Sequence, residues 1–214
     1  MYTKAKIFNL ALNALLLSRQ VTDPVTDQSN EAKVLNSQWD IAFRAALFDM
    51  DLDSTASEQN LELVHDFTVD PPPMNGQPGP RWNYAYKYPD KCAFFRRIVS
   101  CNVIDDKSTH EPKRVMIYKG QKVIFTNVAS AIGEYIPIDF PLQTLSAPAG
   151  VALAMRLAWA SAPLIVGKGA KTLREAIKTD YVIHKAEAQA MDERESFSFQ
   201  EDSNLSEFVK TRMS

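Results

Sequence analysis

The chain has 214 residues, of which 45% are hydrophobic and 23% are charged, and this composition argues against a disordered protein. Its formal net charge of -2 argues against a dedicated nucleic-acid binder, because neutralising many phosphates requires a clear excess of lysine and arginine. Two cysteines, Cys92 and Cys101, are too few for a disulfide framework or a four-ligand zinc site, so we expect reduced thiols in a cytosolic environment.

The charge is unevenly distributed along the chain. Residues 1–79 carry 11 acids and 5 bases, whereas residues 80–122 carry 10 bases and 4 acids. Such segments can attract each other between neighbouring subunits, although a solvated strand face would also account for the basic excess. No stretch approaches 18 uninterrupted apolar residues and the N-terminal run has no cleavage site, so we expect no membrane span and no signal peptide.

Two amphipathic helices are predicted at the N-terminus. Residues 4–18 form the first, with Ile7, Leu10, Ala11, Ala14 and Leu17 at helical spacing. The second runs from Glu31 to about Met50, after a cap around residues 27–29. Its apolar stripe consists of Ala32, Leu35, Trp39, Ala42 and Ala46. A helix with such a stripe must pack against another helix.

After the second helix the period changes. Asp49, Asp51 and Asp53 could bind a cation, but the further ligands of a Ca²⁺ loop are missing, and a solvated acidic turn explains them as well. Prolines and glycines between residues 71 and 80 exclude regular structure. Alternation over 82–88 then indicates a strand, and Lys119-Gly120-Gln121 lies between two more strands of a predicted hairpin.

The helical period returns near the C-terminus. Ser146 followed by Pro148 marks the start of a third helix, which we expect to end between Pro163 and Gly167. A fourth helix is predicted from about Lys171 to Arg194. The predicted fold is therefore α+β, mainly a four-helix bundle with an inserted small antiparallel β-sheet and an extended C-terminal arm. The expected parts are a bundle over 1–70 and 145–195, an inserted β domain over 80–140, and an arm over 196–214.

The string VGKGAKT at 166–172 looks like a phosphate-binding loop. A Walker motif needs G-x-x-x-x-G-K before Ser or Thr, on a loop between a strand and a helix. Here Ala162 stands where the first glycine belongs, and a helix precedes the loop. We therefore interpret the string as a turn between two antiparallel helices, in which Gly167 supplies a left-handed residue at the end of the third helix.

Enzyme signatures are weak elsewhere too. His65, His110 and His184 lie on different predicted elements, and His184 falls on an apolar helical stripe, where a core or interface histidine is common. No G-x-S-x-G or H-E-x-x-H string occurs. We therefore predict a protein that is not an enzyme, with no catalytic residue, no metal and no cofactor.

The tail after Ser196 contains large apolar side chains without a clear period. A frayed terminus is one interpretation. The other is an arm that binds a partner, because four large apolar side chains in a free tail would be exposed to water. The side chains that we predict to contact the portal or a neighbouring subunit are Phe197, Phe199, Leu205 and Phe208.

One run of the sequence resembles a known family. Residues 82–92, WNYAYKYPDKC, with Phe95-Arg96-Arg97-Ile98, are similar to the W-x-Y-A-Y-x-Y-P-x-D-C-L-x-x-R-R-I signature of the tail tubular protein A family, the head-to-tail adaptors of short-tailed bacteriophages. Three flanking segments are similar in the same order: 7–12, 31–33 and 152–158. The likeness covers roughly residues 5–194, although Lys91 and Ala93 depart from the usual Asp and Leu.

The resemblance implies a structural role in the virion, at the head-tail junction, for a protein made in the host cytoplasm. It implies a ring of twelve identical subunits beneath the portal protein. The ring would extend the channel for double-stranded DNA, without sequence-specific binding, and would carry the tail nozzle or tail tube. We expect Tyr84, Tyr86, Arg96 and Arg97 of the β insertion to contact a neighbouring subunit or the tail.

Two other functions fit parts of the sequence. The same Tyr84, Tyr86, Arg96 and Arg97 could form a nucleic-acid-binding module, since aromatic side chains among basic ones can stack on bases. A phosphohydrolase is the third possibility and rests only on the loop at 166–172. DNA binding and nucleotide-dependent heat stabilisation would distinguish these two functions from the adaptor role.

Overall fold

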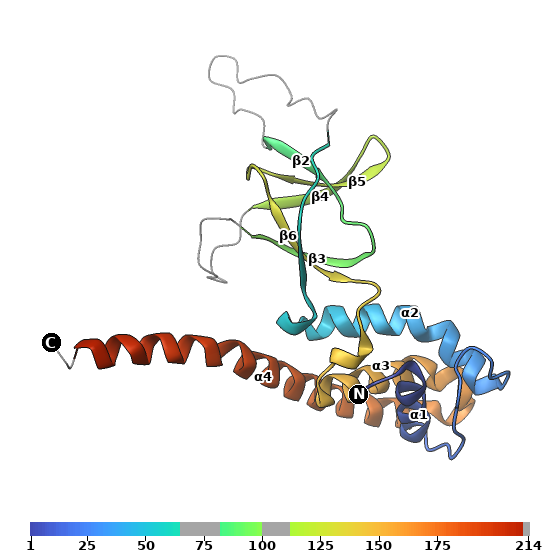
Figure 1. Ribbon diagram of the computed structural model, residues 1–214. Coiled ribbons are helices and arrows are strands. Elements are labelled where there is room, and N and C mark those ends of the chain that lie inside the picture. The colour runs from blue at the N-terminus through green and yellow to red at the C-terminus, as the bar shows by residue number, and fades with distance from the viewer. Residues whose placement is uncertain (65–81, 100–111, 212–214) are drawn as a thin grey trace. The chain divides into compact units, whose positions relative to one another are not determined.

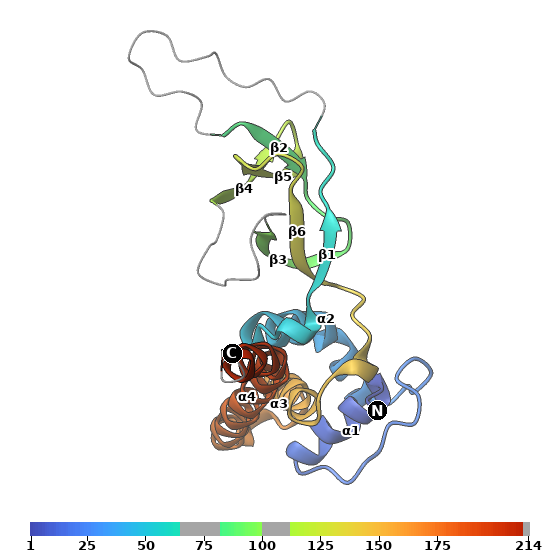
Figure 2. The same cartoon turned by 60° about the vertical axis from the view of Figure 1, so that its left-hand side comes forward.

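The computed structural model describes residues 1–64, 82–99 and 112–211, with side chains described up to residue 195. The chain divides into two compact units (Figures 1 and 2). The first, called here the helical unit, comprises Met1–Thr55 and Phe140–Ser214. The second, the sheet unit, comprises Ala56–Asp139. The sheet unit begins before the predicted boundary at residue 80, because a strand at 57–60 belongs to it.

The helical unit is organised around one central helix. Its four α-helices are α1 (Lys4–Ala14), α2 (Asn30–Met50), α3 (Ala147–Ile165) and α4 (Ala170–Thr211). Short 3₁₀ turns lie at Asp53–Thr55 (η1), Leu142–Thr144 (η2) and Gly167–Gly169 (η3). Helix α3 packs against each of the other three helices. The mixed α+β class is confirmed, whereas the regular four-helix bundle stays a prediction.

The composition of α3 explains its central position. It is rich in alanine, and its small buried residues allow neighbouring helices to approach closely. Near its start, Gly150 lies against the ring of Tyr2, whose hydroxyl donates a hydrogen bond to the Ala147 carbonyl. Helix α3 is also the one helix in the described part of the chain that is long and apolar enough to cross a membrane. Its packing inside this unit accounts for that apolar character.

The starts of the helices follow the predicted capping signals. The Ser29 side chain accepts a hydrogen bond from the Ala32 N–H at the start of α2, and Ser146 accepts one from the Ala149 N–H at the start of α3. Each serine satisfies one of the N–H groups that the first turn of a helix leaves without a partner. The predicted stripe of α2 is buried except at Trp39, which is half-buried under the Lys4 ammonium group.

The loop between α3 and α4 is a turn, as predicted. Gly167 has φ +68, the left-handed conformation that favours glycine, and a single 3₁₀ turn leads from it into α4. Helix α4 does not end at Arg194 but continues to Thr211, so the backbone of the predicted arm is helical over residues 196–211. The prediction that the fourth helix ends before the tail was therefore wrong.

Polar side chains join the end of α2 to α4. The Asp192 carboxylate accepts hydrogen bonds from the N–H groups of Asp53 and Ser54, at 2.6 and 3.0 Å, and so caps η1. The Gln189 amide donates to the Met50 carbonyl, which lies at the last residue of α2. These bonds satisfy backbone groups that the end of α2 and the start of η1 would otherwise expose.

The sheet unit contains two antiparallel three-stranded sheets. Their strands are β1 (Ser57–Asn60), β2 (Tyr84–Lys87), β3 (Cys92–Val99), β4 (Lys113–Tyr118), β5 (Gln121–Thr126) and β6 (Ile132–Pro137). One sheet has the order β1-β6-β3 and the other has the order β2-β5-β4. The predicted hairpin is confirmed as β4 and β5, joined at Lys119 and Gly120, both with positive φ. The sequence did not predict β1.

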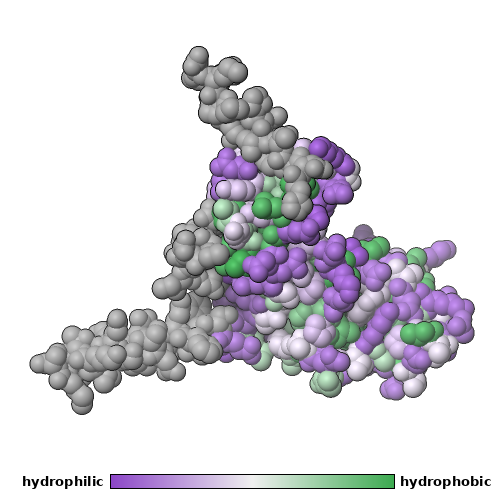
Figure 3. All heavy atoms as spheres, turned by 45° about the horizontal axis from the view of Figure 1, so that its top comes forward, coloured by the Kyte–Doolittle hydropathy of each residue, from purple (hydrophilic) through white to green (hydrophobic). Residues whose placement is uncertain are grey.

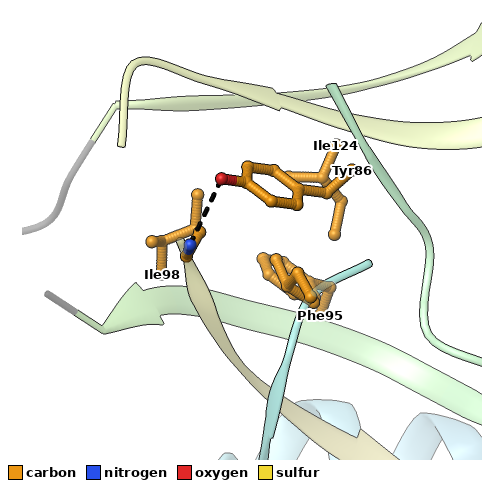
Figure 4. Close-up of a cluster of buried hydrophobic side chains, with 6 residues drawn as sticks. Tyr86, Phe95, Ile98 and Ile124 are labelled. Atoms are coloured by element: carbon orange, nitrogen blue, oxygen red, sulfur yellow. Dashed lines mark hydrogen bonds between the residues drawn. The ribbon is translucent and has the colours of Figure 1, made fainter. Parts of the chain in front are cut away.

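The two sheets bury one cluster between them. Tyr86 and Ile124 from one sheet meet Phe95 and Ile98 from the other (Figure 4). Gly133 on β6 leaves room for this contact, because a Cβ there would lie 2.7 Å from the Phe95 ring. A second, smaller cluster of Ala85, Val123 and Phe125 covers the opposite face of β2 and β5. Side chains are therefore packed against both faces of the β2-β5 pair.

Candidate interaction surfaces

The predicted interface tyrosines have different environments. Tyr86 is fully buried, and its hydroxyl donates a hydrogen bond to the Val128 carbonyl at 2.9 Å. The same hydroxyl accepts one from the Ala131 N–H at 3.3 Å, the dashed line in Figure 4. Tyr84 lies on the same face of β2 and is half-buried. The prediction that Tyr86 contacts a neighbouring subunit or the tail is wrong for this residue, because its side chain belongs to the core between the two sheets.

A β-bulge brings the two predicted arginines together. Neighbouring residues of a regular strand point to opposite faces, but β3 shifts register between Phe95 and Arg97 where it pairs with β6. The Arg96 Nη1 then lies 2.7 Å from Glu134 Oε1, and the Arg97 Nε lies 2.6 Å from Glu134 Oε2. One carboxylate thus accepts hydrogen bonds from both guanidinium groups, which is the re-aiming of side chains that bulges allow.

This cluster of Arg96, Arg97 and Glu134, called here the arginine-glutamate cluster, is nearly closed to solvent. The side chains of Arg96 and Arg97 are 12% and 18% exposed, and that of Glu134 is 4% exposed. Lys113 lies nearby, with its ammonium group 5.1 Å from the centre of the Phe95 ring. Burial lowers the pKa of Lys113, and the charge of Glu134 opposes that effect. Both arginines therefore make their contacts inside the sheet unit, through the carboxylate of Glu134.

These placements weaken the nucleic-acid interpretation. A base can stack only on an aromatic face that it can reach, and the ring of Tyr86 is inside the core. The guanidinium groups of Arg96 and Arg97 already bind a buried carboxylate. Three of the four residues predicted for a nucleic-acid-binding module are thus committed to internal contacts.

A cleft of about 700 Å³ lies in the sheet unit. It is lined in part by residues 87–92, which belong to the run at 82–92 that resembles the adaptor family, called here the family-like run. The Lys122 ammonium sits 3.6 Å from the centre of the Tyr88 ring, a close cation–π contact. Burial raises the pKa of Tyr88 and also that of the Cys92 thiol, whose rise is opposed by a hydrogen bond with Tyr88 and by the charge of Lys122. At neutral pH we therefore expect Cys92 to remain a protonated thiol.

We predict that Cys92 reacts slowly with iodoacetamide. The attacking species is the thiolate, and a raised pKa together with partial burial makes it scarce. The expected alkylation rate at pH 8 in the folded chain is at least about tenfold below that in the urea-unfolded chain. Mass spectrometry of the peptide that contains Cys92 measures both rates, and equal rates would show that the thiol is open and activated.

The acidic residues at the C-terminal end of α2 have structural roles. Asp49 accepts a hydrogen bond from the Tyr181 hydroxyl at 3.0 Å, and the Arg156 guanidinium lies 4.0 Å away. Burial, followed by the charge of Asp49, raises the pKa of Tyr181. Asp51 is the left-handed C-cap of α2. Over the described residues, no three His, Cys, Asp or Glu side chains gather closely enough to hold a metal ion.

The helical unit exposes apolar side chains on the outward faces of two helices. Ile41 and Phe48 are exposed on α2, about two helical turns apart and opposite its buried stripe. On α4, Val182 and Ile183 are exposed on the side away from buried Ile177. Figure 3 shows hydrophobic side chains scattered among hydrophilic ones over this unit. Apolar contacts to another molecule are available on both helices.

A shallow apolar groove lies between the start of α3 and the middle of α4. Its volume is about 670 Å³. Its lining residues include Pro148, Val151 and Met191. His184 lies at this groove, half-buried, with its Nδ1 2.9 Å from Glu187 Oε2. The prediction of a core or interface histidine is consistent with this position, because a partner in the groove would cover the ring.

The side chains of Phe197, Phe199, Leu205 and Phe208 lie outside the described residues, as do His65, His110 and Cys101. Sequence reasoning also missed Glu134, which the bulge pairs with two arginines. It also did not single out Ile41 and Phe48, although their seven-residue spacing on the polar side of α2 was a signal that could have been used.

Comparison with known proteins adds no family assignment. No family model matches the chain, and no curated protein matches it. The likeness to the tail tubular protein A family thus rests on the quoted motifs alone.

Proposed function

We propose that the chain is a structural, non-enzymatic head-to-tail adaptor of a short-tailed bacteriophage virion. Twelve copies form a ring beneath the portal protein, extend the DNA channel and carry the tail nozzle or tail tube. The helices, arranged as a four-helix bundle, make the body of the ring. The segment after residue 196 contacts the portal or a neighbouring subunit, and double-stranded DNA passes without sequence-specific binding.

The two exposed apolar faces of the helical unit are the observation that carries this proposal. A ring of identical subunits needs a heterologous contact, in which one surface of a subunit meets a different surface of the next. The face of α2 with Ile41 and Phe48 differs from the face of α4 with Val182 and Ile183. A contact between these faces in neighbouring copies would bury side chains that one copy leaves exposed to water.

The charge of the protein also suits a conduit. Proteins that hold DNA neutralise many phosphates, whereas this chain has a net charge of -2. Two of its bases, Arg96 and Arg97, bind Glu134 and are largely buried. A channel wall built from such subunits would let DNA move instead of retaining it.

The proposal predicts that Phe48→Asp prevents ring formation. The new carboxylate would lose hydration if the outward face of α2 were buried against a neighbour, whereas we expect the monomer to fold because more than half of the Phe48 side chain is exposed. Electron microscopy of the protein mixed with its portal is expected to show rings for the natural chain and at least about tenfold fewer for the variant.

Leu16→Asp is the matched control, since Leu16 is an exposed apolar side chain of the helical unit that lies after the end of α1 and on neither of the two proposed faces. It should leave the rings intact. Rings formed equally well by Phe48→Asp would remove the α2 face from the proposal. If electron microscopy showed no rings of the natural chain on portals, the adaptor role itself would be overturned.

A further inference from the structure

Strand β4 lies at the edge of its sheet. In the order β2-β5-β4, it pairs with β5 and, in the described part of the chain, with no other strand. One row of its backbone N–H and C=O groups therefore points outward along Lys113–Tyr118. Such an edge can pair with an extended segment of another chain.

The side chains of β4 are those of an interior strand. Val115, Met116 and Ile117 form an uninterrupted apolar run, which is typical of strands buried on both faces. They are 38%, 40% and 77% exposed. The register places Val115 and Ile117 on the face of Ile124, while Met116 shares the other face with Val123. Both faces of this edge strand thus present apolar side chains to solvent.

The opposite kind of edge occurs in the other sheet. Strand β1 is also an edge strand, and its sequence Ser57-Glu58-Gln59-Asn60 is entirely polar. Polar and charged residues protect exposed edges from pairing with other chains. Of the other two edge strands, β2 is hydrogen-bonded on its outer side to residues 62–64, and β3 has no exposed large apolar side chain. In the described part of the chain, β4 is therefore the one edge strand that presents exposed large apolar side chains to a partner.

The charge of the hairpin selects the partner. Residues 112–126 contain four bases, Lys113, Arg114, Lys119 and Lys122, and no acid. Arg114 has no carboxylate partner within the described residues. A second copy of β4 would bring eight positive charges together, which opposes self-pairing. A nucleic acid would match the charge but would leave the apolar side chains without partners.

We propose that β4 binds an extended, acidic segment of a different protein as an added strand. Main-chain hydrogen bonds to the outer edge of β4 supply affinity, as in other cases of strand addition. Apolar side chains of the segment cover Val115 and Ile117, and its carboxylates on the other face meet Arg114. This binding edge stands on the strand alone and does not depend on the ring contacts of the helical unit.

The test uses a fluorescein-labelled peptide, Glu-Val-Glu-Ile-Glu-Val-Glu, and the full-length chain. Fluorescence anisotropy measures its binding, and hydrogen exchange shows which amides it protects. We expect saturable binding with protection along β4. The same peptide with lysine in place of glutamate should bind at least tenfold more weakly, because it meets a hairpin of the same charge.

Ile117→Lys and Arg114→Glu are the test variants. Both side chains are exposed, so both proteins should fold, and each is expected to raise the Kd of the acidic peptide at least tenfold. Glu58→Lys, at an exposed site on the edge strand β1 of the other sheet, is the control and should leave the Kd unchanged.

Three outcomes would overturn the proposal. The first is no binding of the acidic peptide, or binding that Ile117→Lys leaves unaffected. The second is concentration-dependent self-association of the natural chain, seen by sedimentation, that protects β4 and is lost in Ile117→Lys, since a second copy would then be the occupant. The third is a labelled single-stranded DNA that displaces the peptide from β4, since the site would then take nucleic acid.

Discussion

Glu134→Ala is expected to destabilise the sheet unit by about 3–5 kcal/mol, the cost of removing one partner from a buried ionic cluster. The reason is that Arg96 and Arg97, 12% and 18% exposed, would lose the carboxylate that both guanidinium groups bind. Urea denaturation followed by the hydrogen exchange of β6 amides measures the free energy of opening of this unit separately from that of the helical unit.

Glu58→Ala is a sharp control for this prediction. Glu58 lies directly opposite Glu134 in the pairing of β1 with β6, but its side chain is exposed. Like charges on opposed strand positions are unfavourable, so removing Glu58 should leave the stability unchanged or raise it slightly. Equal losses for the two variants would mean that burial of the cluster contributes nothing to stability.

The predictions from sequence that held depend on local signals. Ser146 caps α3 because a serine before the first turn can accept a backbone N–H. Gly167 adopts a positive φ, a conformation that costs glycine less than other residues. The turn at Lys119 and Gly120 joins β4 to β5 because glycine tolerates the conformation that a two-residue hairpin needs. Each of these outcomes is decided within a few residues of the chain.

The features that sequence reasoning missed depend on distant contacts. Strand β1 has a polar sequence and becomes a strand only because β6, more than 70 residues later, pairs with it. The bulge in β3 brings Arg96 and Arg97 to Glu134, more than 30 residues later in the chain, and no local signal near Arg96 predicts it. Helix α4 crosses the predicted end at Arg194 because no glycine or proline follows to stop it. Tertiary contacts or the absence of a stop signal decide these cases.

The family-like run illustrates why a motif does not define an interface. Its tyrosines alternate, which predicts a half-buried strand and leaves open which residues face the core. The structure places Tyr86 inside and Tyr84 at the margin, while both arginines bind Glu134. The run therefore builds the sheet unit, and the surfaces free to meet partners lie elsewhere, on β4 and on the outward helix faces.

Tyr86→Ala should cost about 3–5 kcal/mol of the stability of the sheet unit, the range found when a large aromatic side chain is removed from a core. Tyr86 is fully buried and contacts both sheets through Phe95, Ile98 and Ile124. Melting of the unit, followed by hydrogen exchange of β5 amides, measures the loss.

Two further variants separate packing from hydrogen bonding. Tyr86→Phe keeps the ring and removes only the hydroxyl, which leaves the Val128 carbonyl and the Ala131 N–H without that partner, so we expect a smaller loss of about 1–3 kcal/mol. Tyr84→Ala, at the half-buried neighbouring site, should cost less than Tyr86→Ala because more of its ring already contacts water. The contrary result would be a Tyr86→Ala variant that melts like the natural chain but no longer binds a partner or single-stranded DNA. The ring of Tyr86 would then lie at the surface and not in the core between the two sheets.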